Sequence, residues 1–400
     1  MDDSGRPSVS SQALARPGRL DAYGTSVFAE MSALAVATGA INLGQGFPDE
    51  DGPVELLDAA VAAIRAGANQ YPPGRGIPDL LRAVAAHERR WWSTDYDPET
   101  EVLVTAGATE AIASAILALC GPGDEVVTFE PYYDSYAATI ELSGAWRKVV
   151  ALRSPDWGFD PDELARAVTP ATRLILLNSP HNPTGKVFSR DELQIIARLC
   201  VERDLVAVTD EVYEHLVFDG AHVPLCTFPG MRERTLKISS AGKTFSATGW
   251  KIGWVVGPES LVAAVRSVKQ FLTFAGGTPF QFAVAAALGL DDAHFAGLTA
   301  NLQAKRDRFC DGLQTLGWTI HRPQATYFAI VDIRQFAYAD GWAFCRSLVA
   351  DHGVAAVPTE VFYDDKEAGK PLVRFAFCKQ TAVIDEALRR LARVKPLPPA

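Results

Sequence analysis

The fold is decided by one unit in the middle of the chain, which reads "ATRLILLN" (171–178), "SRDELQIIARLCVERD" (189–204) and "LVAVTD" (205–210). The first and last runs are short and apolar on both faces, which is typical of strands in a parallel sheet that helices cover on both sides. The run between them predicts a helix that begins with a capping box, Ser189 and Glu192. We therefore expect an α/β fold with right-handed crossovers.

The same alternation extends in both directions from this unit. Strands are predicted at "EVLVT" (101–105), "EVVTFE" (125–130) and "TLKISS" (235–240), and a helix is predicted at "ATEAIASAILALC" (108–120). These segments would add further strands and covering helices to one mostly parallel sheet.

The last quarter of the chain predicts a smaller α+β domain. A long helix (about 295–316) is followed by strand patterns in "TYFAIVDI" (326–333) and "PLVRFAFC" (371–378). We expect four parts, which are a flexible N-terminal arm (1–20), an N-terminal segment of the small domain (21–45), a large domain (46–285) and the C-terminal small domain (286–400).

Composition excludes several classes of function. The formal net charge is −10 over 400 residues, which argues against a nucleic-acid partner because phosphate backbones need a basic face. The longest apolar runs are about half a membrane span. None of the six cysteines forms a C-x-x-C motif, so we expect reduced thiols, no metal site and a cytoplasmic protein.

Polar residues follow four of the predicted strands at the point where each strand ends. Asn182 stands in "NSPHNPTGK", Asp210 and Tyr213 stand in "DEVYEH", and Ser240 and Lys243 stand in "SSAGKT". The fourth strand is followed by "AGATEA", which leads directly into a helix. Ligands of parallel α/β sheets bind at these strand ends. The set suits one ligand class, a phosphorylated pyridine aldehyde.

Each group has a role toward such a ligand. A desolvated Lys243 is an amine nucleophile that can form a Schiff base with the aldehyde. Asp210 would keep the pyridine nitrogen protonated, so that the ring works as an electron sink. Tyr213 and Asn182 would hydrogen-bond the phenolate oxygen of the ring.

The phosphate and the ring face have their own candidates. The N–H groups of Ala108 and Thr109 lie at a predicted helix start, where the helix dipole favours an anion. Ser240 and Lys251 would add a hydroxyl group and a positive charge, and Tyr133 would stack on the ring.

Each of these residues also has an ordinary structural interpretation. Taken singly, Lys243 could be a solvated surface lysine, Asp210 a helix cap and "NPTG" a plain turn. The "GKT" triplet is not a nucleotide-binding loop, because that motif needs a glycine where Lys237 stands. The coincidence of all these groups at successive strand ends favours the cofactor site.

Arg374 interrupts the apolar strand "LVRFAFC". A buried guanidinium group without a partner would be costly, so it must reach solvent or pair with an anion. A surface or structural salt bridge is one reading of the residue alone. Beside a reactive lysine, the carboxylate of an amino acid is the favoured partner, because it fits the guanidinium fork.

Several motifs together resemble one enzyme family. "INLGQGFPD" (41–49), "NQYPPG" (69–74), "NSPHNPTGKVFS", "TDEVYEHLVFDG" and "SSAGKTFSATGWKIGWVVGP" are similar to those of the class I/II aminotransferases of fold type I, which depend on pyridoxal 5'-phosphate (PLP). The resemblance covers the chain after about residue 20. It is strongest toward the kynurenine and glutamine transaminases, also called cysteine-S-conjugate β-lyases. The bacterial N-succinyldiaminopimelate aminotransferases share nearly the same motifs.

The resemblance implies a large PLP-binding domain, with a mostly parallel seven-stranded sheet between helices, and a smaller α+β domain. It implies catalytic roles for Lys243, Asp210 and Tyr213. It further implies that Arg374, Asn182 and the backbone of Gly46 hold the substrate carboxylate. The remaining implied roles are cofactor contacts and pocket walls, assigned to Ala108, Thr109, Tyr133, Ser240, Lys251, Phe28 and Phe274.

The resemblance also implies a homodimer, in which Tyr71 crosses the interface to the phosphate of the neighbouring subunit. From it we expect amino transfer from a kynurenine-, glutamine-, aromatic- or methionine-like amino acid to a 2-oxo acid such as 2-oxoglutarate. The alternatives are N-succinyl-LL-diaminopimelate transamination, for which Arg75 is the candidate second basic group, or a specialised β-lyase. A regulator built on the same fold would need a DNA-binding domain.

Overall fold

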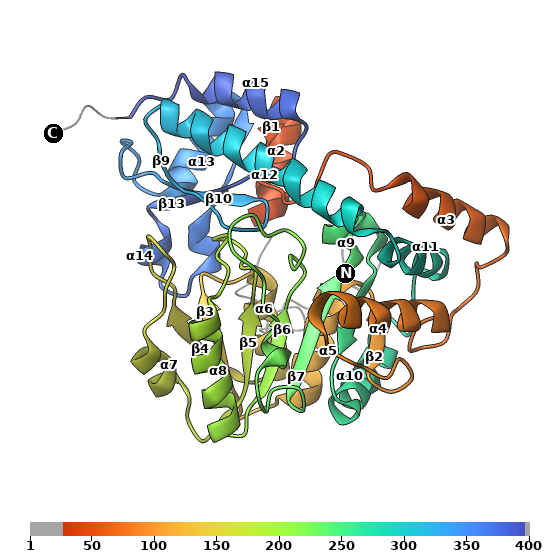
Figure 1. Cartoon of the computed structure of the whole chain (residues 1–400). Helices are drawn as coiled ribbons and strands as arrows, with labels where there is room; N and C mark the ends of the chain where they lie inside the picture. Colours follow the sequence, from red (N-terminus) through yellow and green to blue (C-terminus); the bar gives the residue numbers. More distant parts are fainter. Residues whose placement is uncertain (1–26, 397–400) are drawn as a thin grey trace, which may run out of the picture.

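The computed structural model describes residues 27–396, and a seven-stranded sheet forms their centre (Figure 1). Its strands, from one edge to the other, are β2 (Val102–Thr105), β8 (Gly253–Val256), β7 (Thr235–Ser240), β6 (Val206–Asp210), β5 (Thr172–Asn178), β3 (Glu125–Glu130) and β4 (Trp146–Ala151). All neighbouring strands are parallel except β8, which runs antiparallel to both β7 and β2. The predicted mostly parallel sheet is confirmed; the sequence patterns indicated neither β8 nor β4.

Both faces of this sheet are covered by helices. On one face, the strand residues Leu174 and Leu176 pack in a core with α5 (Gly107–Leu119), α6 (Asp134–Ser143) and α10 (Glu259–Leu272). On the other face, their neighbours Ile175 and Leu177 pack against α7 (Pro161–Ala167) and α8 (Arg190–Glu202). Side chains alternate between the two faces of a strand, so a central strand between two helical layers must be apolar at every position.

The capping box predicted for α8 is present. The Ser189 hydroxyl accepts a hydrogen bond from the Glu192 N–H at 3.2 Å, and the Ser189 N–H donates to the Glu192 carboxylate at 2.8 Å. The helix therefore begins where the sequence predicted, and it returns the chain from β5 to the start of β6.

Beyond β2 and β8, the core is extended by three more helices. The apolar faces of α3 (Val54–Arg65), α4 (Pro78–Trp92) and α11 (Thr278–Leu288) pack together with Val104 and Trp254 of these two strands. In Figure 1 this layer forms the outer part of the molecule on the side of α3.

The C-terminal part forms a second, smaller unit. Its four-stranded antiparallel sheet has the order β12 (Val357–Pro358), β13 (Leu372–Ala376), β10 (Phe328–Asp332) and β9 (Thr319–His321). The helices α12 (Asp292–Thr315), α13 (Gly341–His352) and α15 (Thr381–Leu391) belong to it.

The first described elements join this smaller unit rather than the large sheet. Strand β1 (Ile41–Asn42) pairs in parallel with β11 (Val354–Ala355), and α2 (Val27–Thr38) packs into the same core. Figure 1 shows these red elements among the blue ones. The arm at 1–20 lies outside the described residues, and the four domain limits stay predictions.

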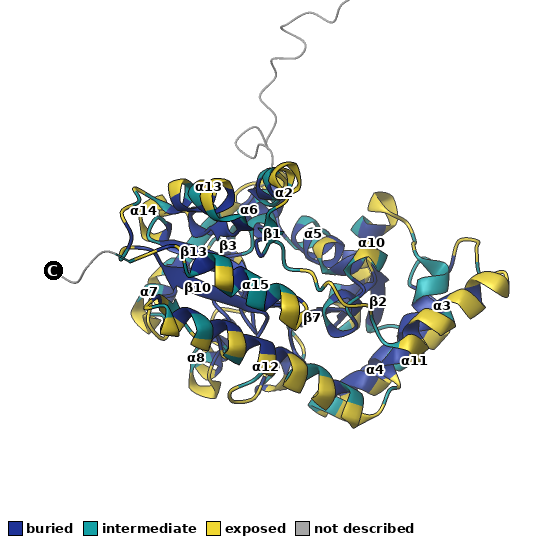
Figure 2. Ribbon diagram, turned by 90° about the horizontal axis from the view of Figure 1, so that it is seen from above, coloured by how far each residue is buried: buried dark blue, intermediate teal, exposed yellow. Residues whose placement is uncertain are grey.

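Figure 2 shows the strands as buried and the outward faces of the helices as exposed, which is the pattern of a chain folded around covered sheets. Within the described part of the chain, no helix combines the length and the apolar character that crossing a membrane would require.

Candidate active site

A cavity of about 520 Å³ opens at the carboxyl ends of the central strands, between the large sheet and the smaller unit. Twelve of the predicted site residues line it, namely Phe28, Gly46, Ala108, Thr109, Tyr133, Asn182, Asp210, Tyr213, Ser240, Lys243, Lys251 and Arg374. The predicted residues Tyr71 and Phe274 do not.

The ends of β5 and β6 are locked together by one amide. Asn178 and Asp210 are partners in the register of the two strands. The Asn178 side chain donates to the Asp210 carbonyl at 2.8 Å, and it accepts a hydrogen bond from the Asn182 N–H at 2.7 Å. The loop that carries Asn182 is thereby fixed beside the acid at the end of β6.

Asp210 is buried with a phenol as its nearest partner. The Tyr136 hydroxyl donates to Asp210 Oδ2 at 2.5 Å, and the Val212 N–H donates to Oδ1 at 3.4 Å. Burial raises the pKa of Asp210 to about 6, against the hydrogen bonds from Tyr136 and Val212. Above that pH, Asp210 is a carboxylate that can pair with a protonated ring nitrogen. Tyr136 was missed by the sequence reasoning, although it lies three residues after Tyr133.

Lys243 lies on the short helix α9 (Ala241–Thr244), directly after β7. Its Nζ atom lies 5.8 Å from the ring centre of Tyr213 and 5.7 Å from that of Tyr327. Burial lowers the pKa of Lys243 to about 8. Within residues 27–396, no hydrogen bond or ion pair engages this Nζ atom. Its neutral, nucleophilic form is therefore more accessible near neutral pH than that of a solvated lysine.

An anion can bind where α5 begins. The N-cap residue Ala106 offers no side chain to the first N–H groups of this 13-residue helix, so Ala108 and Thr109 present theirs to the cavity. Gly107 has φ +76°, and a Cβ there would lie 3.3 Å from Lys251 Nζ. The ammonium group of Lys251 is thus held against the same backbone turn.

Arg374 comes from β13 of the smaller unit and is 1% exposed. Its Nη1 donates to Asn182 Oδ1 and its Nη2 to the Gly44 carbonyl, both at 2.9 Å, while its Nε atom has no partner. No carboxylate of residues 27–396 forms a salt bridge with it, and the ring of Phe328 lies 4.0 Å from its Cζ atom. A buried guanidinium group whose partners are all neutral is a receptor for an incoming carboxylate.

Glycine is required where the backbone closes over this receptor. A Cβ on Gly46 would come within 2.4 Å of the Phe328 ring. The Gly46 carbonyl accepts a hydrogen bond from the Tyr327 hydroxyl at 2.7 Å. Phe28 completes this wall, with its ring 5.1 Å from Arg374 Cζ.

Tyr71 and Phe274 lie together on the surface instead. Their rings contact edge to face at 5.7 Å, and the two residues are 83% and 48% exposed. Their predicted roles at a subunit interface and in the substrate pocket stay predictions. Arg75, the candidate second basic group for a succinylated substrate, is not at the cavity of its own chain either. Its Nη2 donates to the Val102 carbonyl of β2 at 2.8 Å, and it does not line the cavity.

The donor set fits a phosphorylated pyridine aldehyde. Lys243 offers an amine to the aldehyde, Asp210 an acid to the ring nitrogen, and the start of α5 with Lys251 a phosphate site. The Nε atom of Arg374 has no hydrogen-bond partner among the described residues, so it remains free to donate to a substrate carboxylate.

Comparison with known proteins points to one family. A probable N-succinyldiaminopimelate aminotransferase of Mycobacterium tuberculosis is 54% identical over 94% of this chain and 97% of its own length. A methionine aminotransferase of Escherichia coli is 39% identical over 94% and 97%. Kynurenine–oxoglutarate transaminase 3 of Mus musculus is 37% identical over 92% and 88%.

The solved structure of the N-succinyldiaminopimelate aminotransferase from Mycobacterium tuberculosis superposes with a TM-score of 0.93, covering 95% of this chain and 100% of that one. The family model for aminotransferase class I and II matches residues 38–391. The chain therefore belongs to the class I and II aminotransferases, and it is a PLP-dependent transaminase.

Proposed function

We propose that the amino donor is N-succinyldiaminopimelate and that the acceptor is a 2-oxo acid such as 2-oxoglutarate. The observation that carries this proposal is the 54% identity to the mycobacterial enzyme along nearly the whole chain, against 39% and 37% for the methionine and kynurenine enzymes. The initial expectation of a kynurenine-, glutamine-, aromatic- or methionine-like donor has the weaker support and becomes the second candidate.

When bound, PLP supplies an electron sink for the charge that develops at the α-carbon of the substrate. Arg374 binds the α-carboxylate with its guanidinium fork, and Asn182 holds that fork through Nη1. Lys243 then removes the α-proton and returns it, because burial lowers its pKa to about 8 and so makes the free amine more populated than in a solvated lysine. Asp210 and Tyr213 orient the ring from the turn after β6.

A donor comparison tests the substrate. With 2-oxoglutarate as acceptor, kcat/KM is measured for N-succinyl-LL-diaminopimelate, kynurenine, glutamine and methionine. We expect the succinylated donor to exceed the others by at least about 100-fold, as for a site that hydrogen-bonds polar groups of its substrate. Equal or better turnover of kynurenine or methionine would favour the second candidate, whose structural support is the aromatic wall of Phe28, Phe47 and Phe328.

We further propose a homodimer in the cytoplasm. The exposed aromatic side chains of Tyr71, Phe271 and Phe274 support a contact with a second copy, since large apolar groups rarely gather on a free surface. The six buried cysteines, all without disulfides, support a reducing compartment. Sedimentation of the holoenzyme would refute the dimer by giving the monomer mass at micromolar concentration.

A further inference from the structure

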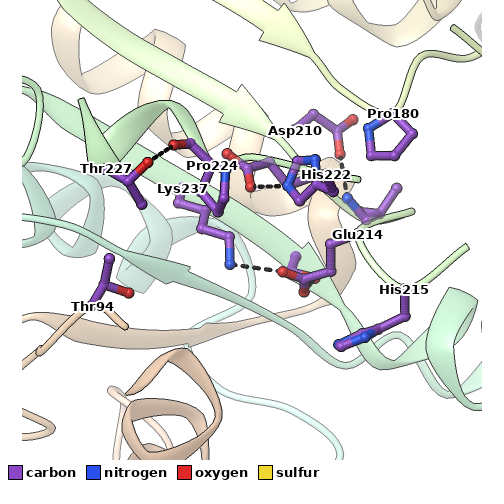
Figure 3. Close-up of polar contacts among 12 residues, drawn as sticks. Thr94, Pro180, Asp210, Glu214, His215, His222, Pro224, Thr227 and Lys237 are labelled. Carbon is purple, nitrogen blue, oxygen red and sulfur yellow. Dashed lines mark hydrogen bonds and ion pairs between the residues drawn. The ribbon is translucent and has the colours of Figure 1, made fainter. Parts of the chain in front are cut away.

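The turn after β6 has two sides with different surroundings. Asp210 and Tyr213 line the cavity, whereas Glu211, Glu214 and His215 are buried away from it. Each of these three has a partner from another part of the chain. Figure 3 shows the contact of Glu214 with Lys237. Glu211 pairs with His222 Nε2 at 2.6 Å, and His215 Nε2 lies 3.0 Å from Nε2 of His87 on α4.

Glu214 has the partners that matter for the site. Its Oε2 accepts a hydrogen bond from Lys237 Nζ at 2.7 Å, and its Oε1 accepts one from the Ser239 hydroxyl at 2.5 Å. Lys237 and Ser239 both lie on β7, the strand that leads into α9 and Lys243. Glu214 therefore connects the turn that carries Asp210 to the strand that delivers the reactive lysine.

Glu88 on α4 is a matched partner of the same ammonium group. Lys237 Nζ donates to Glu88 Oε1 at 2.7 Å and to Oε2 at 2.9 Å, and the side chains of Glu88, Glu214 and Lys237 have no exposed surface. Glu88 has no hydrogen bond to the turn among the described residues. Two carboxylates thus bind one cation at the same shortest distance of 2.7 Å, and only Glu214 belongs to the turn after β6.

The surroundings of Glu214 favour its ionised form. Burial alone would raise its pKa, but Lys237 and the neighbouring histidines hold it below the ordinary value. Burial raises the pKa of Glu88 to about 7, against the pull of Lys237.

The spacing and the charges of these residues argue against a metal site. His87, Glu214 and His215 bring three possible ligand atoms within 4.8 Å of one another. His87 Nε2 and Glu214 Oε1 are 4.0 Å apart, wider than the separation of about 3.4 Å that tetrahedral bonds of 2.0–2.2 Å give. The Lys237 ammonium group is also bound to the same carboxylate, and it would repel a cation there.

We propose that Glu214 is a positioning residue. Its ion pair with Lys237 and its hydrogen bond from Ser239 set the distance between the Asp210–Tyr213 turn and Lys243. At this distance Asp210 would face the ring nitrogen of bound PLP and Lys243 would reach its aldehyde. The contact acts through the backbone, since Glu214 itself does not line the cavity.

The test compares Glu214→Gln with Glu88→Gln in the holoenzyme. Each change removes one negative charge from beside the Lys237 ammonium group and should lower the midpoint of unfolding. Only Glu214→Gln should shift the pH midpoint of the visible absorbance of the bound cofactor, by at least about half a pH unit, and weaken PLP binding about 10-fold. Glu88→Gln should leave the absorbance midpoint and PLP affinity unchanged.

A second pair covers the case in which Glu214→Gln does not fold. Ser239→Ala removes one hydrogen bond to Glu214, and Thr94→Ala removes one to Glu88. Ser239→Ala should move the absorbance midpoint in the same direction by a smaller amount, and Thr94→Ala should not move it. Equal shifts within the pair that folds, or no shift in either member, would overturn the positioning role.

Discussion

Lys237 and Lys243 are six residues apart on one strand-and-helix segment, and the protein treats them in opposite ways. Lys237 lies in the middle of β7 between the carboxylates of Glu88 and Glu214. Burial alone would lower its pKa, but the two ion pairs hold it above the ordinary value. Lys243 lies at the cavity without such a partner among the described residues, and burial lowers its pKa to about 8.

The difference separates cations that stabilise the fold from those that remain available for ligands. Removing a charge from water is costly unless a partner compensates for it. Lys237 finds that partner within the chain, whereas Lys243 and Arg374 form no ion pair among the described residues and contact rings and neutral acceptors instead. The latter two remain ready for an aldehyde and a carboxylate.

The largest expected effect comes from removing each lysine in turn. Lys243→Ala should lower kcat/KM by at least about 1,000-fold, because it removes the proton-transfer base. Its free energy of unfolding should change by about 1 kcal/mol or less, since no partner loses a bond. Lys237→Met should instead cost about 3–5 kcal/mol of stability, because it leaves two buried carboxylates without their cation.

Two measurements distinguish these outcomes. Urea unfolding of the apoprotein gives the stability, and borohydride reduction followed by mass spectrometry shows whether PLP becomes fixed to the chain. Lys148→Ala, a change at a half-exposed lysine that pairs with Glu125 at 3.2 Å, serves as the control for both. A Lys243→Ala enzyme that retained normal turnover would show that the lysine is not the base.

The next largest effect is expected at Arg374, the cation contributed by the smaller unit. Arg374→Lys keeps a charge but loses the planar fork, so a bidentate contact with a carboxylate is no longer available. We expect kcat/KM for the amino donor to fall about 100-fold, mostly through KM, which corresponds to about 2.7 kcal/mol. PLP affinity, measured by titration of the apoprotein, should change less than about 3-fold. An equal loss of both would assign Arg374 to the cofactor instead.

The sequence predicted those parts of the site that are local to a strand end. Asn182, Asp210 and Lys243 each follow a run of β-forming residues, so topology alone brings them to one edge of the sheet. The pairing of β8 could not be read this way, because an antiparallel neighbour within a parallel sheet leaves no signature in its own four residues.

Contacts between distant segments could not be predicted either, because the sequence around one residue does not indicate a partner far along the chain. Tyr136 binds an acid 74 residues away, and Arg374 binds an amide 192 residues away. Lys237 was visible in the sequence only as the residue that breaks a nucleotide-binding motif. Its function depends on Glu88 and Glu214, and only the fold brings those two carboxylates together.

The smallest expected effect tests the acid on the cavity side of the same turn. The Tyr136 hydroxyl opposes the rise that burial causes in the pKa of Asp210, which stands at about 6. A raised carboxyl pKa means that the charge is present above that value and is lost as the pH falls through it. The low-pH limb of the kcat/KM profile should therefore move to higher pH in Tyr136→Phe, with a loss of a few-fold at pH 7 for one hydrogen bond of about 1 kcal/mol.

Tyr132→Phe is the matched control, because its hydroxyl donates at the same 2.5 Å to Asp364, a carboxylate that does not line the cavity. It should lower stability without moving the pH profile. If Tyr136→Phe left the acid limb in place, Asp210 would not be the group whose ionisation the rate requires. In that case Asp210 could not be counted among the charged groups that act on the ligands.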